Sequence, residues 1–243
     1  GYPVASFWLY QTDGIFQNQE EVDAFYEMYY YTANGGVKPN NILPAPGETG
    51  LNRLRPGARK LVDLNGDGAI TTEDLYYAGD AAPRLAFSIK AGLEWKGIDF
   101  SAFFQGIGKQ VTLRTGSIYA PFVTNYTMQN STFMGKTWTP ENPDAQYTIL
   151  SRDNGFNRFN YENKDISVQN NRYIRLKSLV IGYSLPKQWI AKAGLSKLRF
   201  YFSGDDLWEW TKIKDGYDPE HGEGGNNTFP FSRLITFGVD LTF

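Results

Sequence analysis

The residues with the clearest chemical potential lie between Asp63 and Asp74. Oxygen-bearing groups recur there at the spacing of a loop that wraps around a hard cation. The candidate ligands are Asp63, Asn65, Asp67, the backbone carbonyl of Ala69, Thr71 and Asp74. Gly68 permits the sharp turn inside the loop, and Ile70 supplies an apolar anchor beside it. We therefore predict a metal site over residues 63–74.

The spacing matches an EF-hand or dockerin loop, whose ligands stand at about positions 1, 3, 5, 7, 9 and 12. One position departs from it, because Asp74 replaces the longer glutamate that usually chelates calcium with both oxygens. We expect Ca²⁺, with Mg²⁺ as the alternative ion, in a structural role, since no pair of amphipathic helices flanks the loop. The competing interpretation is a loop held by Asx turns without a metal.

No catalytic constellation is evident. The chain has no cysteine and one histidine, His221, which excludes thiolate chemistry and leaves a Ser–His–Asp arrangement without recognisable partners. Neighbouring carboxylates such as Asp205 and Asp206 are more often solvated charges than a glycosidase pair. We expect that the chain is not an enzyme.

Aromatic side chains in the long polar segments are the candidates for contact with a substrate. They are Tyr119, Trp138, Trp208 and Trp210. Such rings can stack on sugars or contact peptides, and they can equally pack loops against one another. The pattern does not separate these two interpretations.

The elements that must carry these segments are long strands with apolar residues at every second position. The expected strands are 85–95, 98–104, 173–185, 197–205 and 233–243. The first two are joined by the tight turn Lys96-Gly97. Several approach the ~9–11 residues that a tilted membrane strand needs. The last alternates Ile235, Phe237 and further apolar residues up to Phe243.

Short turns at 96–97 and 186–195 alternate with long segments at 34–83, 107–170 and 206–232. Brief turns on one side and long loops on the other are typical of outer-membrane barrels. We predict an all-β chain, the C-terminal portion of a transmembrane antiparallel β-barrel with long extracellular loops and a short helix.

The N-terminal region should hold the smaller elements. We expect a short strand at 2–10, a turn at Thr12-Asp13-Gly14 and a helix over Gln19–Tyr31 capped by Asn18.

Composition is compatible with this prediction. The 243 residues are 41% hydrophobic and 16% aromatic, with a mean hydropathy of -0.44 and a net charge of -2. No run reaches the ~18 apolar residues of a transmembrane helix, and nothing indicates a basic surface for nucleic acid. The start at Gly1 has no signal-peptide pattern, so we expect a processed chain or a piece of a longer one.

Several motifs occur in a characteristic order along the chain. They are Asp13-Gly-Ile-Phe-Gln17, Pro46-Gly47, Val62-Asp-Leu-Asn-Gly-Asp-Gly68, Phe103-Phe-Gln-Gly106, Trp138-Thr-Pro-Glu-Asn-Pro143, Tyr173-Ile-Arg-Leu-Lys-Ser-Leu179, Leu185-Pro186, Gly216-Tyr-Asp-Pro-Glu220 and the aromatic terminal strand. In this order, residues 1–243 resemble the C-terminal part of the SusC/RagA family of TonB-linked outer-membrane proteins.

The resemblance implies part of an outer-membrane active-import channel for oligosaccharides or peptides, set in the lipid bilayer. It implies a SusD-like lipoprotein partner and energy from TonB, contacted through an N-terminal part and plug that this chain lacks. It also implies that the loop at 63–74 belongs to an extracellular loop, and that Phe243 is the signal read during barrel assembly.

A second hypothesis is a soluble, calcium-stabilised carbohydrate-binding β-sandwich. The two hypotheses differ in where the apolar faces of the strands point. A sandwich buries them between two sheets, whereas a barrel turns them outward to lipid.

Overall fold

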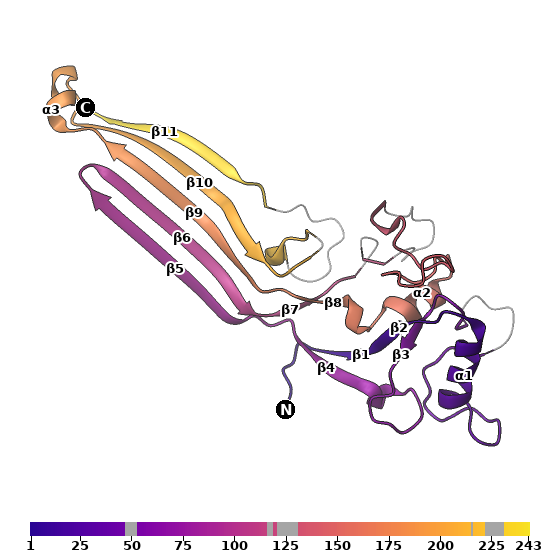
Figure 1. Ribbon diagram of the computed structural model, residues 1–243. Coiled ribbons are helices and arrows are strands. Elements are labelled where there is room, and N and C mark those ends of the chain that lie inside the picture. Colours follow the sequence, from indigo (N-terminus) through magenta and orange to yellow (C-terminus); the bar gives the residue numbers. More distant parts are fainter. Residues whose placement is uncertain (47–52, 116–118, 121–130, 215, 222–230) are drawn as a thin grey trace. The chain divides into compact units, whose positions relative to one another are not determined.

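The computed structural model describes residues 1–46, 53–115, 119–120, 131–214, 216–221 and 231–243. These residues form two compact units (Figure 1). The first unit takes the described residues within 1–81 and 112–169, and the second takes those within 82–111, 170–222 and 228–243. Each unit is therefore built from segments that are separated in the sequence.

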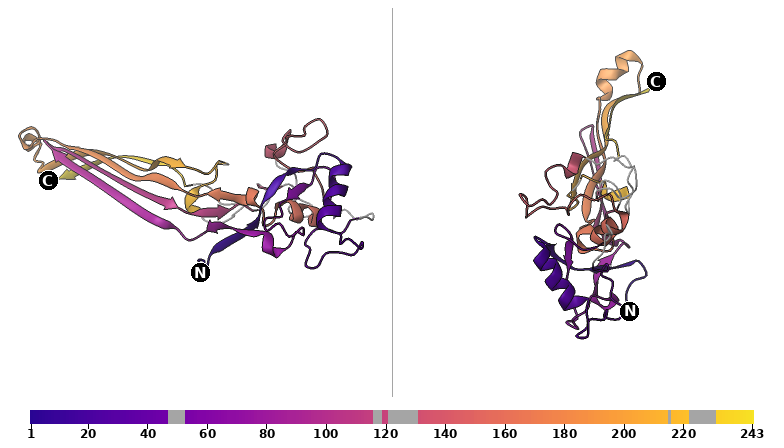
Figure 2. Two further views of the ribbon diagram at one scale, coloured as in Figure 1. Left: turned by 60° about the horizontal axis from the view of Figure 1, so that its bottom comes forward. Right: turned by 90° about the vertical axis from the view of Figure 1, so that its right-hand side faces the viewer.

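The second unit is a five-stranded antiparallel sheet with the strand order β11-β10-β9-β6-β5. Its strands are β5 (Arg84–Trp95), β6 (Ile98–Lys109), β9 (Tyr173–Ser184), β10 (Lys197–Thr211) and β11 (Leu234–Thr242). The left view of Figure 2 shows these strands lying side by side. The structure confirms the predicted strands, and it extends two of them, β6 and β10, beyond their expected ends.

The β5–β6 hairpin closes at Lys96-Gly97, as the sequence predicts. Both residues have positive φ, +48° and +86°, which is the backbone of the hairpin turn whose twist matches that of the strands. A Cβ at Gly97 would lie 2.6 Å from the carbonyl oxygen of Ser184, so this position has no room for a side chain. Beyond β9, the turn at 186–195 contains α3 (Lys187–Ile190) and the 3₁₀ helix η4 (Ala191–Ala193).

Two β-bulges interrupt β9 and β10 at the same level. In β9, Lys177 is an extra residue between Leu176 and Ser178, which both pair with β6. In β10, the two residues Asp206 and Leu207 lie opposite the single residue Lys177. Because an odd residue reverses the side-chain alternation, the β9 segments before and after Lys177 turn their apolar residues to the same face. This explains why residues 173–185 look apolar on both faces in the sequence.

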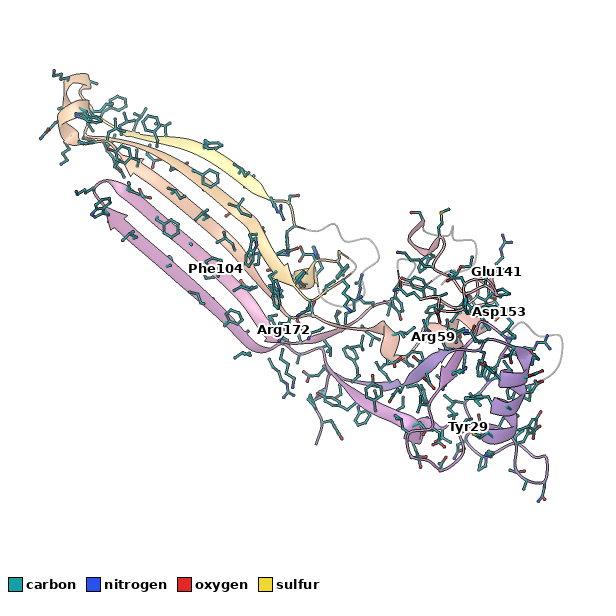
Figure 3. All side chains as sticks on the ribbon, viewed as in Figure 1. Tyr29, Arg59, Phe104, Glu141, Asp153 and Arg172 are labelled. Atoms are coloured by element: carbon teal, nitrogen blue, oxygen red, sulfur yellow. The ribbon has the colours of Figure 1, made fainter. Side chains whose placement is uncertain are left out.

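One face of the five-stranded sheet is apolar and exposed. Ile89 is 56% exposed, Leu93 62% and Phe237 78%. Phe104, labelled in Figure 3, belongs to this face because it pairs with Ile89. The opposite face carries the charged residues of the same strands, among them Arg175 and Arg199. The sheet thus turns an apolar surface outward rather than against a second sheet.

Within the described residues, no helix is both long and apolar enough to cross a membrane.

The first unit contains short strands and helices around an aromatic core. Its elements, in chain order, are β1 (Ser6–Tyr10), β2 (Thr12–Ile15), α1 (Gln19–Tyr29), β3 (Arg59–Leu61), η1 (Thr72–Asp74), β4 (Leu75–Asp80), η2 (Ser131–Phe133), α2 (Asn154–Tyr161) and η3 (Asp165–Ser167). Strand β1 pairs with β4, and β2 pairs with β3. Two further short strands, β7 (Val111–Leu113) and β8 (Val168–Asn170), pair with each other.

Helix α1 begins where the sequence predicts. The side chain of Asn18 accepts a hydrogen bond from the Glu21 N–H at 2.9 Å, which satisfies one of the free donors of the first turn. The helix ends at Tyr29, two residues before its expected end. Its buried face holds Val22 and Tyr26, which join the core cluster. That cluster also includes Phe16, Leu54, Ala58, Leu61, Ile70 and Phe156.

Three local predictions are wrong. The first strand starts at Ser6 rather than at residue 2. The expected turn at Thr12-Asp13-Gly14 lies inside β2, because Gly14 adopts φ +73° within an irregular pairing with β3. The segments 34–83, 107–170 and 206–232 are not only loops, since they hold β3, β4, α2 and the end of β10. Parts of them, at 47–52, 116–118, 121–130, 215 and 222–230, lie outside the described residues.

Candidate functional site

The predicted metal loop is held by hydrogen bonds from its backbone N–H groups to its own side chains. The two carboxylate oxygens of Asp63 accept from the N–H groups of Gly66 at 2.7 Å and Gly68 at 2.8 Å. The side-chain oxygen of Asn65 accepts from the Asp67 N–H, and Asp67 accepts from the Ala69 N–H, both at 2.8 Å. The bonds of Asn65 and Asp67 are successive Asx turns, and Asp63 closes the loop over them. Together they hold three of the predicted ligands on one short stretch of chain.

Asp74 is turned differently from a chelating ligand. It is fully buried, at 0% exposure. One oxygen accepts from the Leu64 N–H and the other from the Thr71 N–H, each at 2.8 Å. With Thr71 it forms a capping box at the start of η1. Both oxygens are therefore engaged in fixing the loop, as is the Thr71 hydroxyl, which accepts from the Glu73 N–H.

The arrangement of the loop does not fit a complete six-ligand calcium site. Among the residues that the structure describes, no three Asp, Glu, His or Cys side chains gather as a metal-holding group. The ammonium group of Lys38 donates to the Gly68 carbonyl oxygen, which places a positive charge beside the loop. Ile70 is buried at 0% exposure, as its role of apolar anchor predicts. Calcium or magnesium binding here remains a prediction.

Two of the four candidate aromatic side chains lie in the first unit. Trp138 is buried at 4% exposure, and its indole N–H donates to the Gln17 side chain at 2.9 Å. Its ring therefore helps to hold the unit together. Tyr119 lies beside Tyr161, with ring centres 6.1 Å apart in an edge-on arrangement. Burial raises the pKa of the Tyr119 hydroxyl well above its ordinary value.

Tyr119 and Tyr161 line a cavity of about 250 Å³ within the first unit. Arg114, Asn157 and Ser167 also contribute to its wall. All three are buried, which is unusual for polar residues, so the cavity wall combines buried polar groups with the two tyrosine rings.

The other two candidates are not loop residues. Trp208 and Trp210 lie in β10, and they share the apolar face of the sheet with their pairing partners Leu176 and Ile174. They are 50% and 42% exposed. The prediction that they are loop residues is wrong. The strand continues beyond the bulge at Asp206, but the sequence pattern is interrupted there and predicts an end to the strand. Substrate contact by any of the four residues remains a prediction.

An ion network that the sequence reasoning missed lies on the polar face of the sheet. Arg175 is 2% exposed. Its guanidinium pairs with Asp218 at 2.8 Å, with Glu220 at 3.3 Å and, very closely, with Glu209. The bulge residue Lys177 adds contacts to Glu220 at 3.0 Å and, opposite it in β10, to Asp206 at 2.9 Å. The network fastens the segment around η5 (Pro219–His221) to the sheet.

Aromatic rings complete this network. The Phe231 ring lies 5.0 Å from the Lys177 ammonium and 5.7 Å from the Arg175 guanidinium. His221 stacks on the same ring, with centres 4.8 Å apart. The motifs 173–179 and 216–220 contain most of these residues, but the sequence does not show that they meet, since about forty residues separate them.

A second ion cluster crosses three strands near the hairpin end of the same face. The Arg199 guanidinium binds both oxygens of Asp99, at 2.8 and 2.6 Å, and reaches Asp240 at 2.9 Å. It therefore ties β6, β10 and β11 together across the polar face. Phe243, beyond the end of β11, is 88% exposed.

Known proteins resemble this chain over its whole length. The TonB-dependent receptors P26 and P3 of Formosa agariphila are each 26% identical to it, over 95% and 100% of the chain. The chain spans only 22% of the length of either relative. No protein-family model matches the chain.

Solved structures of the RagAB peptide importer share the fold. The 'closed-closed' state matches 100% of the chain and 23% of its own chain, with a TM-score of 0.62 and 19% identity. The 'open-open' state matches 98% of the chain with a TM-score of 0.58 and 20% identity. The comparisons confirm the resemblance to part of a TonB-dependent receptor of the SusC/RagA kind. Its β fold is that of the corresponding part of RagAB.

Proposed function

We propose that this chain is part of an outer-membrane active-import channel for oligosaccharides or peptides. In this proposal the five-stranded sheet is a section of the barrel wall, with its apolar face toward lipid and its polar face toward the lumen. The first unit is built from the segments that follow the extracellular ends of the strands. Peptides are the cargo that the name of the structural neighbour RagAB gives for that importer.

One observation carries the proposal. All five strands place most of their apolar side chains on one exposed face, while the ion networks of Arg175 and Arg199 lie on the other. A water-soluble protein rarely exposes so many contiguous apolar residues. A barrel strand has this arrangement because its outer face meets hydrocarbon and its inner face meets water. The same exposure counts against the soluble β-sandwich, which would bury these residues between its sheets.

The partners follow from the resemblance. We propose that a SusD-like surface lipoprotein covers the channel, and that TonB supplies energy through a part of the transporter outside this chain. We also propose that β11 is an edge that pairs with another strand of the barrel, and that Phe243 takes part in assembly.

Two substitutions in β5 test which face meets lipid. Ile89 lies on the apolar face and Ser88, its neighbour, on the polar face, and both are exposed. Ile89→Lys in the complete transporter should cost roughly 2–4 kcal/mol of barrel stability if the residue lies near the middle of the bilayer. Ser88→Lys, the matched control, should cost less than about 0.5 kcal/mol, as surface changes do.

The readout is the outer-membrane fraction and the heat-modifiable electrophoretic mobility of each variant. Impaired insertion by Ile89→Lys alone supports the proposal. Equal behaviour of the two variants would refute it, because an exposed Ile in water tolerates Lys. Uptake of labelled peptides and labelled oligosaccharides, with and without TonB, then identifies the cargo class. Co-purification identifies the lid lipoprotein.

A further inference from the structure

We propose that one end of the five-stranded sheet binds the phosphate-bearing headgroups of membrane lipids. The site is formed by Arg172, directly before β9, and Lys212, directly after β10, around the ring of Trp210. The inference rests on the proposed function, since it requires the apolar face to lie in a membrane. It adds a specific ligand class and its binding residues. Figure 3 shows Arg172 at the end of the sheet where β9 begins.

Both cations lie against the same tryptophan. The Arg172 guanidinium is 5.7 Å from the centre of the Trp210 ring, and the Lys212 ammonium is 5.4 Å from it. The backbone N–H of Lys212 donates to the Arg172 carbonyl oxygen at 3.0 Å, so the two residues are held beside each other. The Nε of Arg172 is buried and has no hydrogen-bond partner among the described residues. The pair therefore combines two positive charges with an exposed aromatic ring.

Trp210 lies at a level where a membrane boundary is expected. Its partner Ile174 pairs with Gly106, and Gly106 pairs with Phe87 of β5. From Phe87 to Trp95 at the other end, β5 covers roughly 26 Å at about 3.3 Å per residue. The usual strand tilt shortens this to roughly 20 Å, close to the ~25 Å apolar band of membrane barrels. Tryptophan favours such boundaries, because its ring is mostly apolar and its N–H is polar.

The acidic residues near this end, Glu209, Asp218 and Glu220, pair with Arg175 on the polar face of the sheet. The sequence segments 82–84, 107–111, 170–173 and 210–214 contain no Asp or Glu. Their cations are Arg84, Lys109, Arg172, Lys212 and Lys214. At the hairpin end, by contrast, Lys96 and Arg199 are accompanied by Glu94 and Asp99. The segments around Arg172 and Lys212 thus carry cations without an acidic residue of their own.

A lipid phosphate fits these groups better than other anions do. Arginine binds phosphate through paired N–H donors, and lysine binds it as a point charge. The tryptophan ring and the apolar face below it, including Trp208, can contact the acyl chains of the same molecule. A free anion would contact only the two cations. An anionic lipid would contact the cations through its phosphate and the apolar face through its acyl chains.

The test uses the complete transporter in a neutral detergent, titrated with short-chain phosphatidylglycerol and, separately, with inorganic phosphate. Binding is measured by native mass spectrometry. The test variant is Arg172→Gln/Lys212→Gln. Lys187→Gln/Lys192→Gln is the matched control, because it removes two exposed charges from the turn at the opposite end of the sheet.

We expect the test variant to bind phosphatidylglycerol roughly 30-fold more weakly, since each cation near an anionic lipid contributes roughly fivefold. The control should change by less than about twofold on the same scale. Equal lipid affinity of the test variant and the unmodified transporter would overturn the inference. So would inorganic phosphate binding as tightly as the lipid. Outer-membrane insertion is measured in parallel. If the unmodified protein did not insert, the proposed function would be wrong, and the lipid site that rests on it would be wrong too.

Discussion

Replacing Arg175 with alanine should be among the most destabilising single changes in the five-stranded sheet. The Arg175 side chain is 3% exposed and pairs with three carboxylates, Glu209, Asp218 and Glu220. Removing it leaves those acids without their shared cation. Breaking a buried ion pair from one side generally costs about 3–5 kcal/mol, because a charge stays buried without a partner.

The surroundings indicate the lower end of that range. The Glu209 side chain is 36% exposed and can regain water. Glu220 keeps its contact with Lys177 at 3.0 Å. Asp218, at 4% exposure, keeps the N–H groups of Glu220 and Phe231, at 3.0 and 3.2 Å, and the His221 ring at 4.0 Å. Of the three carboxylates, only Asp218 stays buried without a nearby lysine or arginine. We therefore expect the free energy of unfolding to fall by about 3 kcal/mol.

The assay is equilibrium urea unfolding of the complete transporter in detergent micelles, with Lys192→Ala as the control. Lys192 is exposed in the turn after β9, so its loss should change the unfolding free energy by less than about 0.5 kcal/mol. Arg175→Lys should fall between the two, because it keeps the charge but loses the planar fork of donors. A loss below about 1 kcal/mol for Arg175→Ala, the level of an exposed pair, would refute the buried-network reasoning.

The pH dependence gives a second check. Burial alone would raise the pKa of Asp218, but the N–H groups of Glu220 and Phe231 and the Arg175 guanidinium hold it below its usual value. A lowered folded pKa contributes stability above the unfolded pKa, and that stability is lost as the pH falls through the folded value. In Arg175→Ala this acid-side loss should shrink, so the two unfolding curves should approach each other below about pH 4.

Three further changes test other parts of the structure. Burial lowers the pKa of Lys164 to about 8, so the first unit should gain roughly 2 kcal/mol between pH 8 and about pH 10, where the unfolded chain still holds the proton. Thermal unfolding of Lys164→Met should lack this rise, and a rise that persists would contradict the assignment. Asp63→Ala should cost about 1–2 kcal/mol without calcium, because two backbone N–H groups lose their acceptor. If the loop binds calcium, chelator should lower the melting temperature of the unmodified protein but not of the variant, and no chelator effect on either would exclude calcium. Gly97→Ala should weaken the hairpin by about 1–3 kcal/mol, because the new Cβ meets a carbonyl oxygen. If Gly97→Ala and the unmodified protein had the same heat-modifiable electrophoretic mobility across a temperature series, the turn would accommodate the Cβ and the prediction would be wrong.

The β5–β6 hairpin could be predicted from the sequence because its information is local. Apolar residues at every second position define the strands, and Lys96-Gly97 defines the turn. The full length of β10 could not be predicted in the same way. Asp206 places a charge where the alternation calls for an apolar residue, and Leu207 places an apolar residue where it calls for a polar one. The pattern is therefore interrupted there, although Trp208 and Trp210 resume the period and the face of Phe200 and Phe202.

The polar contacts were less predictable than the strands. The oxygen-rich spacing of 63–74 indicates a loop, and the structure has one. The same spacing does not reveal that Asp74 faces inward as a helix cap. Arg175 and Asp218 meet because a strand and a distant segment fold together, and no period or short motif records such a contact. The sequence does contain one indication of the contact. Arg175 lies inside a predicted strand, and a buried arginine needs an acidic partner.

The interleaving of the two units has a consequence for folding order. The first unit joins segments on both sides of residues 82–111, and those residues are β5, its turn and β6. An unstructured stretch of that length would impose an entropic cost on closing the first unit. The hairpin places Arg84 opposite Lys109, which brings the two ends of the stretch together. The hairpin joins two strands that are adjacent in sequence and can grow outward from its tight turn, so it can form early and shorten the effective loop. A defect in its turn should therefore slow the assembly of the first unit, although none of that unit's own residues has changed.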